Sequence, residues 1–562
     1  MSRLEIASPK KAKIVMEGLY KDLERRIESS PPGLCPVDMA RAFLELCHAQ
    51  TCGKCVPCRI GLGQLNNFIR EVLDGKATMK TLDIMEQTAL SIMESADCAI
   101  GYEAANMVYK GLIGYRDDYV EHIQNGRCTC TYNQPVPCVS LCPAHVDIPG
   151  YVALVGEGRY ADAIRLLRKD NPFPTTCGFI CEHPCEARCR RNMVDDSINI
   201  RGLKRVAADF AGEVDPPQCA PDTGKKIAIL GGGPGGLSAA YYLQLMGHQT
   251  TVYEMLPKLG GMLRYGIPNY RLPKDRLDDD IRAILKTGVQ VKNGLKIGQD
   301  ITIQQLRQEY DVVLITIGAS TDKKLGLENE DADGILSAVQ FLRNVGKNQI
   351  MDLTGKEVAV IGGGNVSMDA VRTAKRLGAK KVSIVYRRRV ADMTALPGEI
   401  DGAVAEGIEL QTLKAPASID VDENHHVKGI YVTPQMVSSI RDGRASIKPT
   451  GEEDIYIPCD VLIVAIGQNI ETHHFEQAGI PVERGKIVTK STGAFENLPG
   501  VFAGGDCASG PASVIKAIAA AKVVAANIDE YLGYHHEISC DVEFPVAYRD
   551  DRSGFVRVNF TD

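Results

Sequence analysis

The sequence predicts an α/β fold in which mainly helical segments precede two nested, doubly wound domains. Two glycine-rich loops, at 231–236 and 362–367, each lie between a short apolar strand and a helix. The apolar strand at 311–318 is repeated at 460–467, and fourteen of the eighteen cysteines lie before residue 190. Such loops are typical of dinucleotide binding, and closely spaced thiols are typical of iron–sulfur clusters. We therefore predict two nested Rossmann-like dinucleotide-binding domains preceded by mainly α-helical iron-sulfur domains.

The composition fits a globular chain of several domains and gives no sign of nucleic-acid binding. A length of 562 residues suggests three or four domains. Apolar residues make up 44% of the chain and charged residues 24%, which is ordinary for such proteins. The 64 basic and 71 acidic residues give a net charge of -7, so no positive surface for a nucleic acid is expected.

The N-terminal stretch lacks the layout of an export signal. Residues 1–25 mix charges with apolar residues at helical spacing, instead of a basic segment followed by an apolar one. No run approaches the about 18 uninterrupted apolar residues that predict a membrane span. We expect a cytoplasmic protein with no membrane span, and in that reducing compartment cysteines bind metals more often than they form disulfides.

Four cysteines in the first hundred residues are candidate ligands of one cluster. Cys52, Cys55 and Cys58 share a short loop, and Cys98 follows after a stretch of helical pattern. Zinc ligands usually come as two separated pairs, whereas Cys-x2-Cys-x2-Cys is a ferredoxin-like spacing. The spacing therefore favours a 4Fe-4S cluster over a structural zinc site.

Residues 15–115 resemble the C-terminal iron–sulfur domain of the flavin-bearing NADH dehydrogenase subunit of respiratory complex I and of related NAD-linked hydrogenases. The likeness rests on Cys52-Gly-Lys-Cys-x-Pro-Cys-Arg and on the later Ser95-x-x-Cys-x-x-Gly. The domain for FMN and NADH that precedes this module in that family is absent here. The resemblance implies that the cluster exchanges electrons with another subunit.

Eight more cysteines lie between residues 128 and 189, enough for two cubane clusters. The later four have a spacing that would suit one helix face, but Pro184 would break that helix. We therefore expect loops wrapped around two 4Fe-4S clusters. The candidate ligands are Cys128, Cys130, Cys138, Cys142, Cys177, Cys181, Cys185 and Cys189.

From this set to about residue 530, the chain resembles the small subunit of NADPH-dependent glutamate synthase and its relatives, which include dihydropyrimidine dehydrogenase. The shared motifs are Cys138-x3-Cys-Pro-Ala-His-Val-Asp-Ile-Pro, Asn171-Pro-Phe-Pro and Cys177-Gly-x2-Cys-x3-Cys-Glu-x2-Cys.

This resemblance implies that early and late cysteines interleave, with Cys142 joining the later run and Cys189 completing the earlier group. The chain departs from the family in its opening pair, which has one residue between its cysteines instead of two. It also has Lys204 where some relatives have an acidic or amide ligand. A lysine cannot serve as that ligand, so Cys177 is the candidate replacement.

The first glycine loop has the strand, the helix and the acid of a dinucleotide fingerprint. It follows an apolar strand at 225–230 and opens a helix to about Met246, and a second strand ends at Glu254. The glycines permit a tight turn and close approach of a pyrophosphate, and Glu254 is placed to accept from ribose hydroxyls. The predicted ligands are Gly231, Gly233, Pro234, Gly236 and Glu254.

The second glycine loop repeats this pattern with one informative change. Arg387 and Arg388 follow its second strand, at 381–386, where the first unit has its acid. A carboxylate would repel a 2′-phosphate, whereas arginine pairs with it through charge-assisted hydrogen bonds. A solvated basic face is the alternative interpretation. We predict an NADP(H) site that includes Gly362, Gly364, Asn365, Val366, Arg387 and Arg388.

The repeated closing strands end in glycine turns at Gly318 and Gly467, which we also assign to cofactor binding. This repeat predicts that the second α/β unit is inserted in the first. The later segment 501–506 resembles the flavin-ribityl motif of two-dinucleotide flavoproteins. That resemblance implies that Gly505 and Asp506 bind the ribityl chain of FAD. It also implies that a helix opening at Ala512 and Ser513 directs its positive end at the flavin.

Residues 260–274 are close to a hallmark of the glutamate synthase small-subunit family, in which they line FAD. A surface turn rich in glycine and proline is the alternative, and the length of the match disfavours it. The resemblance implies FAD contacts from Gly261, Met262, Arg264, Gly266, Ile267, Pro268 and Arg271.

We predict five segments along the chain. They are a helical 4Fe-4S domain (1–120), a helical domain with two 4Fe-4S clusters (121–220), an FAD-binding domain (221–325 and 468–530), an NADP(H)-binding domain (326–467) and a C-terminal tail (531–562).

Together the resemblances imply an oxidoreductase with FAD, NADP(H) and three 4Fe-4S clusters, in which hydride transfer between cofactors needs no catalytic side chain. The leading hypothesis is a subunit of an electron-bifurcating NADH-dependent ferredoxin:NADP oxidoreductase, a transhydrogenase. Its partner subunits would hold FMN, the NADH site and a 2Fe-2S cluster. Alternatives are the NADPH-oxidising subunit of a glutamate synthase-like enzyme, an NADP-linked hydrogenase or formate dehydrogenase module, and a non-enzymatic cluster scaffold.

Overall fold

The chain folds into two compact units in the computed structural model. The structure describes residues 15–21, 23, 35–125, 136–187, 189, 191, 196–441 and 444–543. Unit 1 comprises Met1–His145 and His183–Ile200, and unit 2 comprises Val146–Glu182 and Arg201–Asp562. Within the described ranges, no helix combines the length and the apolar character that a membrane crossing requires.

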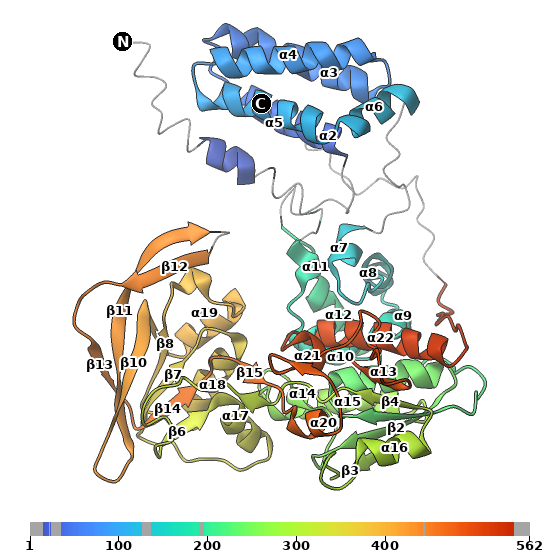
Figure 1. Cartoon of the computed structure of the whole chain (residues 1–562), viewed down its shortest axis with the longest axis vertical. Coiled ribbons are helices and arrows are strands. Elements are labelled where there is room, and N and C mark those ends of the chain that lie inside the picture. Colours follow the sequence, from blue (N-terminus) through green and yellow to red (C-terminus); the bar gives the residue numbers. More distant parts are fainter. Residues whose placement is uncertain are drawn as a thin grey trace. The chain divides into compact units, whose positions relative to one another are not determined.

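Unit 1 contains a helical bundle, coloured blue in Figure 1. Its helices bury apolar residues at helical spacing, as α3 does with Leu62, Leu65, Ile69 and Val72. The helices are α2 (Pro36–Ala49), α3 (Leu62–Leu73), α4 (Met79–Ser95), α5 (Ala99–Gly114) and α6 (Arg116–Asn125), with a π-helical turn at Pro57–Gly61. Two short helices, α7 (Pro137–Leu141) and α11 (Pro184–Ala187), pack on each other in the same unit.

Unit 2 begins with short helices and continues into a parallel sheet. The helices are α8 (Ile148–Gly156), α9 (Tyr160–Asp170), α10 (Pro174–Ile180) and α12 (Ile200–Phe210). The strands of this first sheet run in the order β18-β4-β1-β2-β3. Their bounds are β1 (Lys226–Leu230), β2 (Gln249–Glu254), β3 (Gln290–Asn293), β4 (Val312–Ile315) and β18 (Val501–Ala503).

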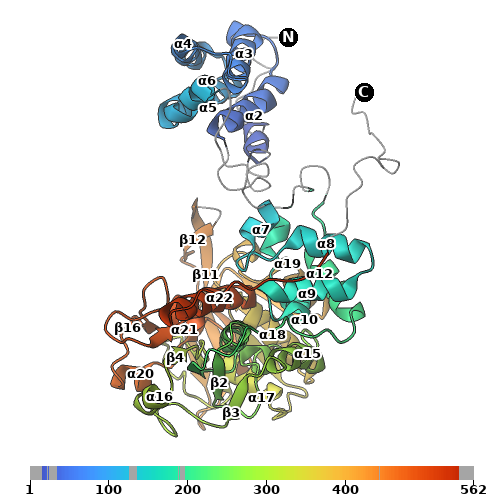
Figure 2. The same ribbon diagram turned by 90° about the vertical axis from the view of Figure 1, so that its right-hand side faces the viewer.

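Helices cover the first sheet, and α13 and α22 pack closely on each other. Figure 2 shows α22 beside the helices and strands of this fold. The helices are α13 (Pro234–Leu245), α14 (Met262–Tyr265), α15 (Lys274–Leu285), α16 (Ile303–Glu309), α20 (His473–Gln477), α21 (Asp506–Ser509) and α22 (Val514–Tyr531).

A second parallel sheet follows, in the order β6-β14-β7-β8-β9. Helices α17 (Ala338–Gly346), α18 (Asn365–Arg376) and α19 (Pro397–Ala405) share an apolar core with it. Its strands are β6 (Ile335–Ser337), β7 (Glu357–Ile361), β8 (Lys381–Tyr386), β9 (Glu409–Thr412) and β14 (Val461–Val464).

The second sheet also packs on an antiparallel sheet, through a second core that includes Ile361 and Val385 from the parallel strands and Ile430 from β11. Figure 1 shows this antiparallel sheet, in orange, beside the second fold. Its strands are β10 (Lys414–Val421), β11 (Val427–Arg441), β12 (Arg444–Pro449) and β13 (Ile455–Pro458).

The chain order of the strands shows that one fold is inserted in the other. After β14 completes the second sheet, the chain returns and β18 pairs with β4 in the first sheet. A two-stranded connection joins the folds, formed by β5 (Thr321–Asp322) and β15 (Gln468–Asn469). A second short pair is β16 (Val482–Glu483) with β17 (Lys486–Ile487). The predicted fold class, two nested Rossmann-like folds preceded by helical segments, is confirmed.

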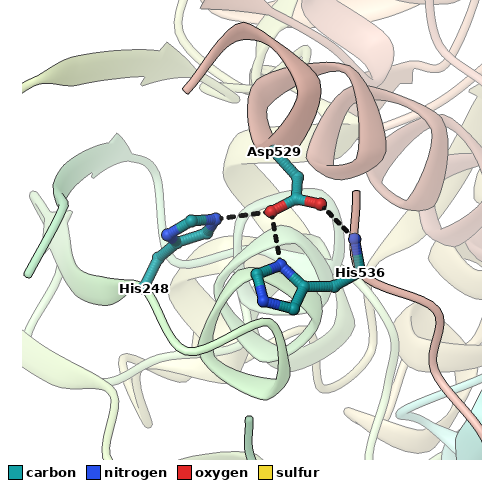
Figure 3. A group of neighbouring side chains, drawn as sticks. All are labelled: His248, Asp529 and His536. Atoms are coloured by element: carbon teal, nitrogen blue, oxygen red, sulfur yellow. Dashed lines mark hydrogen bonds and ion pairs between the residues drawn. The ribbon is translucent and has the colours of Figure 1, made fainter. Parts of the chain in front are cut away.

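The segment after α22 is held on the first fold by a buried carboxylate (Figure 3). Asp529 Oδ1 lies 2.9 Å from His248 Nε2 and 2.8 Å from His536 Nδ1, and its Oδ2 accepts the backbone N–H of His536 at 2.7 Å. Burial lowers the pKa of His248, so its neutral ring is favoured. Burial opposes ionisation of Asp529, but hydrogen bonds from both histidines hold its pKa below the usual value. The three side chains therefore satisfy one another without a cation.

Candidate functional site: two dinucleotide cradles and three thiol groups

The loop after α2 brings four predicted cluster ligands together in unit 1. Burial raises the pKa of the Cys58 thiol to about 12, and the nearby Cys55, Cys98 and Cys52 add to this rise. Cys52 is exposed, whereas Cys58 is buried. Cys98 caps the N-terminus of α5, so one helix end and one tight turn position all four thiols.

Backbone groups prepare this site for negative charge. Burial raises the pKa of Cys55, but N–H groups of Cys58 and Asp97 outweigh it and lower the pKa below the usual value. Gly101 leaves room for the neighbouring thiol, because a Cβ there would lie 2.6 Å from Cys58 Sγ. The site suits a group bound by thiolates.

A second thiol group lies where α7 packs on α11. Burial raises the pKa of Cys138, and the adjacent Cys189 and Cys142 contribute, against opposing backbone hydrogen bonds. Cys185 is buried on α11 in the same unit. Cys138, Cys142 and Cys189, three of the predicted ligands, therefore lie close together here. Cys128 and Cys130 lie outside the described residues.

In unit 2, helix α10 carries Cys177 and ends at its C-cap Cys181. Burial and the nearby Cys181 raise the pKa of Cys177, while the charge of Lys204 opposes the rise. Lys204 thus lies beside the thiol that we predicted as its replacement in the ligand set. The division of the eight cysteines between two clusters stays a prediction.

Asp280 on α15 fixes the start of α10. Its carboxylate, fully buried, accepts the backbone N–H of Thr175 at 3.2 Å and of Thr176 at 2.7 Å. Burial raises the pKa of Asp280 to about 6, although these hydrogen bonds oppose the rise. Because free N–H groups at a helix start need acceptors, this carboxylate links the thiol-bearing helix to the first fold.

A cavity opens where the strands of the first sheet end, as expected for a parallel α/β fold. It is formed by the first glycine loop, the end of β2, the loop before α14, the turn after β4 and the turn before α21. The lining residues include Gly231, Gly233, Pro234, Glu254, Gly261, Met262, Tyr265, Gly318, Arg343, Gly505 and Asp506.

The glycines of this cavity divide into two kinds. A Cβ on Gly236 would collide with the carbonyl oxygen of Gly231, and one on Gly231 (φ +111°) would lie 2.5 Å from the Thr316 carbonyl oxygen. These two residues are required by the packing of the turn. Apart from the adjacent residues, no atom of the described part of the chain lies within 4 Å of a Cβ built on Gly318 or Gly505, so their lack of a side chain leaves the cavity open.

Two carboxylates border the cavity. Glu254 accepts the N–H groups of Gly232 and Leu256, both at 2.7 Å, and burial raises its pKa while these bonds oppose the rise. Burial raises the pKa of Asp506 to about 6, against an opposing hydrogen bond from the Ala512 backbone. Ser513 is the N-cap of α22, so this helix starts beside the cavity.

Arg343 is a cavity residue that the sequence motifs did not reveal. It comes from α17 of the second fold, and its Nη2 donates to the Ser320 carbonyl at 2.6 Å. Its Nε is buried and finds no hydrogen-bond partner within the part of the chain that the structure describes. A buried donor of this kind fits an anionic ligand in the cavity.

Two predicted FAD ligands point to other partners. Arg264 donates to the Leu259 carbonyl at 2.5 Å and to Asp278, and Arg271 pairs with Asp369 on α18. The rest of the motif shapes the loop itself. A Cβ on Gly266 would collide with the Met262 side chain, and the carbonyl groups of Ile267 and Pro268 accept hydrogen bonds from Lys274 and from the backbone at 271–272.

The second glycine loop opens α18 in the same way. Gly364 is the N-cap, and Asn365 Oδ1 accepts the N–H of Leu396 at 3.0 Å. Val366 packs against the apolar core that α17, α18 and α19 share with the second parallel sheet. Gly362 has φ +144°, and a Cβ there would collide with the Ala465 carbonyl oxygen. Gly467, at φ +130°, makes the turn after β14.

The two arginines after β8 differ in their surroundings. Arg387 is exposed, directly beyond the strand end. Arg388 is half-buried, and its Nε donates to the Ala445 carbonyl on β12 at 3.1 Å. Arg387 is therefore the better placed of the two to meet a ligand on the second glycine loop.

A Rossmann-like fold with an open glycine cradle, and a second such fold inserted in it, define an oxidoreductase that uses two dinucleotides. The chain belongs to the pyridine nucleotide-disulphide oxidoreductase family, whose family model matches residues 225–521. The NADH-ubiquinone oxidoreductase-F iron-sulfur binding region matches residues 38–122. The dihydropyrimidine dehydrogenase domain II, 4Fe-4S cluster, matches residues 114–215. The predicted flavin oxidoreductase class is confirmed, as are regions for 4Fe-4S clusters.

Curated relatives extend over most of the chain. The NADP(+)-dependent formate dehydrogenase subunit beta of Moorella thermoacetica is 32% identical, over 88% of this chain and 79% of the relative. The NADPH-Fe(3+) oxidoreductase subunit beta of Geobacter sulfurreducens is 34% identical, over 89% and 79%. The glutamate synthase [NADPH] small chain of Escherichia coli is 33% identical, over 70% of this chain and 88% of the relative.

Proposed function

We propose that this chain is an NADP(H)-dependent FAD and iron–sulfur subunit that passes electrons between NADPH and the redox centres of a larger complex. The carrying observation is the exposed Arg387 directly after β8, where a dinucleotide bound on the second glycine loop presents its adenosine ribose. An arginine there supports selection of a 2′-phosphate. The names of the three relatives, each with NADP or NADPH, support the same cofactor.

The first cavity fits FAD. The open glycines and the start of α13 would bind the pyrophosphate, Glu254 and Asp506 would accept from hydroxyl groups, and Arg343 would supply positive charge. FAD bound there supplies the step between two-electron exchange with a nicotinamide and one-electron exchange with clusters. The protein orients the two dinucleotides and excludes water, since no side chain must take up a proton in a hydride transfer.

The twelve predicted cysteine ligands would hold three 4Fe-4S clusters. Cys52, Cys55, Cys58 and Cys98 would hold the first one, and backbone N–H groups at Cys55 would stabilise its negative charge. The eight cysteines between 128 and 189 would hold two more, with Cys142 and Cys189 exchanged between the early and late runs.

We propose further that the complex is an electron-bifurcating NADH/ferredoxin:NADP transhydrogenase in the cytoplasm, with partner subunits for FMN and NADH and for a 2Fe-2S cluster. The joining of a complex I-type cluster region to a glutamate synthase-type region supports this. A complex with formate dehydrogenase or Fe(3+) reductase activity is the second candidate, because those two relatives match nearly nine tenths of this chain.

Anaerobic titration of the purified chain tests the core of the proposal. NADPH should bleach the flavin while NADH bleaches it far more slowly, and the protein should contain roughly a dozen irons. No bleaching by NADPH, or zinc in place of iron, would contradict the proposal. Purification of the native complex then separates the candidates: an FMN-bearing subunit with NADH and ferredoxin activity supports the transhydrogenase, and a formate-oxidising subunit supports the alternative.

A further inference from the structure

Two consecutive residues of the first fold dock on helix α18 of the second. Arg271 Nη1 lies 2.7 and 2.6 Å from the two carboxylate oxygens of Asp369, and its Nε lies 3.2 Å from Glu399 on α19. The ring of Tyr270 lies against the guanidinium groups of Arg372 and Arg376. Its centroid is 4.9 Å from Arg372 Cζ and 4.0 Å from Arg376 Cζ. One face of α18 is therefore covered by this pair.

The Arg271 contact is desolvated. The side chain of Arg271 is 11% exposed and that of Asp369 is 6% exposed. A buried ion pair contributes little net stability because both charges lose water, but it specifies one geometry, since a shift of either partner leaves a charge unpaired. Arg372 extends the network by pairing with Glu399 at 2.9 Å and with Glu406 at 2.9 Å.

Each partner of this ion pair lies on an element next to one of the two predicted dinucleotide sites. Asp369 lies one turn into α18, the helix that the second glycine loop opens. Arg271 lies just after the loop whose Gly261, Met262 and Tyr265 line the first cavity. The folds also meet nearby, because a Cβ on Gly346 of α17 would lie 3.0 Å from the Tyr265 Cα. The ion pair thus joins the two elements that would carry the reacting dinucleotides.

We propose that Arg271 is a positioning residue for hydride transfer, which holds α18 and the second glycine loop in register with the loop lining the first cavity. This replaces the expectation that Arg271 contacts FAD, and it rests on the proposed function. The rate of hydride transfer depends steeply on the approach of the two reacting rings, so a displacement of about 1 Å can slow it about 100-fold. A rigid contact between the folds therefore controls the rate without touching either cofactor.

Three variants of the full chain test this role: Arg271→Gln, Arg271→Lys and Asp369→Asn. With R271Q, the rate of flavin bleaching at saturating NADPH should fall about 10- to 100-fold, while the FAD content and the Kd of NADP+ change less than about twofold. The long-wavelength absorbance that a nicotinamide gives when it stacks on reduced flavin should weaken in parallel. R271K keeps the positive charge but lacks the planar guanidinium that binds both carboxylate oxygens, so its bleaching rate should lie between those of R271Q and wild type.

Asp369→Asn should reproduce the slow bleaching, although this residue is not among those that line the first cavity. The double variant R271Q/D369N should be no slower than the slower single variant, because both changes break the same ion pair. Arg282→Gln is the matched control: this arginine is 66% exposed and pairs with Asp279 at the surface, so its bleaching rate should equal that of wild type.

Three results would overturn the inference. Loss of FAD from R271Q would show that Arg271 is a cofactor ligand. An unchanged or faster bleaching rate in R271Q or D369N would show that the ion pair does not set the reactive geometry. Additive losses in the double variant would show two separate roles. If R271Q does not fold, D369N alone decides. A wild-type chain that NADPH fails to bleach would instead refute the proposed function.

Discussion

The first and second glycine loops share a strand, a turn and a helix, but they differ in how tightly the turn is closed and in the charged residue at the end of the next strand. In the first loop Gly236 packs against the Gly231 carbonyl, whereas the second has the buried Ser367 at the same position. Glu254 turns inward and accepts N–H groups of its own fold, whereas Arg387 faces solvent. The first loop is thus held by contacts within its own fold, whereas the second has an exposed arginine at the end of the next strand.

The largest effect is expected from adding a side chain inside the tight turn of the first glycine loop. Gly236→Ala should cost more than about 3 kcal/mol and abolish FAD binding, because the new Cβ collides with the Gly231 carbonyl. Flavin content and the thermal midpoint measure this. Gly156→Ala, at an exposed site on α8, is the control, since a Cβ built there meets no described atom within 4 Å and the fold should tolerate it. Equal flavin loss in both variants would show that packing does not distinguish these glycines.

Asp506 has a counterpart in neither glycine loop, and it makes the first fold sensitive to pH. Its folded pKa of about 6 lies above the ordinary value of 3.8, so its contribution favours folding at low pH and is lost as pH rises through about 6. Relative to Asp506→Asn, the apoprotein should lose up to about 3 kcal/mol between about pH 4 and pH 7. Denaturation at both pH values tests this. A pH-independent difference would contradict the assigned pKa.

The arginine of the second loop should set the choice between NADPH and NADH. Arg387→Gln should weaken use of NADPH by about 2–3 kcal/mol, roughly 30- to 150-fold in kcat/KM, because a charge-assisted pair with the 2′-phosphate is lost. The rate with NADH serves as the internal control and should be unchanged. Arg388→Gln should have the smaller effect, since its Nε is held by Ala445. A larger effect at Arg388 would assign the phosphate to that residue.

The smallest effect is expected at the inward-facing acid of the first loop. Glu254→Gln replaces one carboxylate oxygen by an amide group, so one of the two backbone N–H groups loses its acceptor. FAD affinity should fall by about 1 kcal/mol, roughly fivefold, in a fluorescence titration of the apoprotein. Glu309→Gln, at an exposed site on α16, is the control. A loss far above tenfold would show that the bond from a hydroxyl group of FAD to Glu254 outweighs the contacts of Glu254 with its own backbone.

The elements around both loops were predictable because buried parallel strands are short apolar runs bounded by turns. The expected strand at 381–386 coincides with β8, and the expected strand at 225–230 begins one residue later as β1. The insertion of the second fold followed from the repeated closing strand. The antiparallel sheet β10–β13 was not predicted, because its strands are half-exposed and show no clear alternation of apolar and polar residues. One signal was overlooked, since the dipeptide Asp442-Gly443 between β11 and β12 is typical of a two-residue hairpin turn.

Three arginines show that the sequence predicts which loops form the cavity but not where long side chains point. Arg264 and Arg271 belong to a motif that lines a cavity, yet one shapes its own loop and the other pairs with Asp369, 98 residues away in sequence. Arg343 reaches the cavity from α17 and belongs to no motif. A motif identifies a loop, but which way each long side chain points depends on tertiary neighbours that the local sequence does not encode.

The hydrogen bonds around Asp529 have a practical consequence for handling this polypeptide. A truncation after Leu532 would leave every strand of the described residues in place, yet it would remove His536 and deprive a buried carboxylate of two of its three hydrogen bonds. We expect such a shortened version to express poorly, whereas an affinity tag placed after Cys540 should leave the anchor intact.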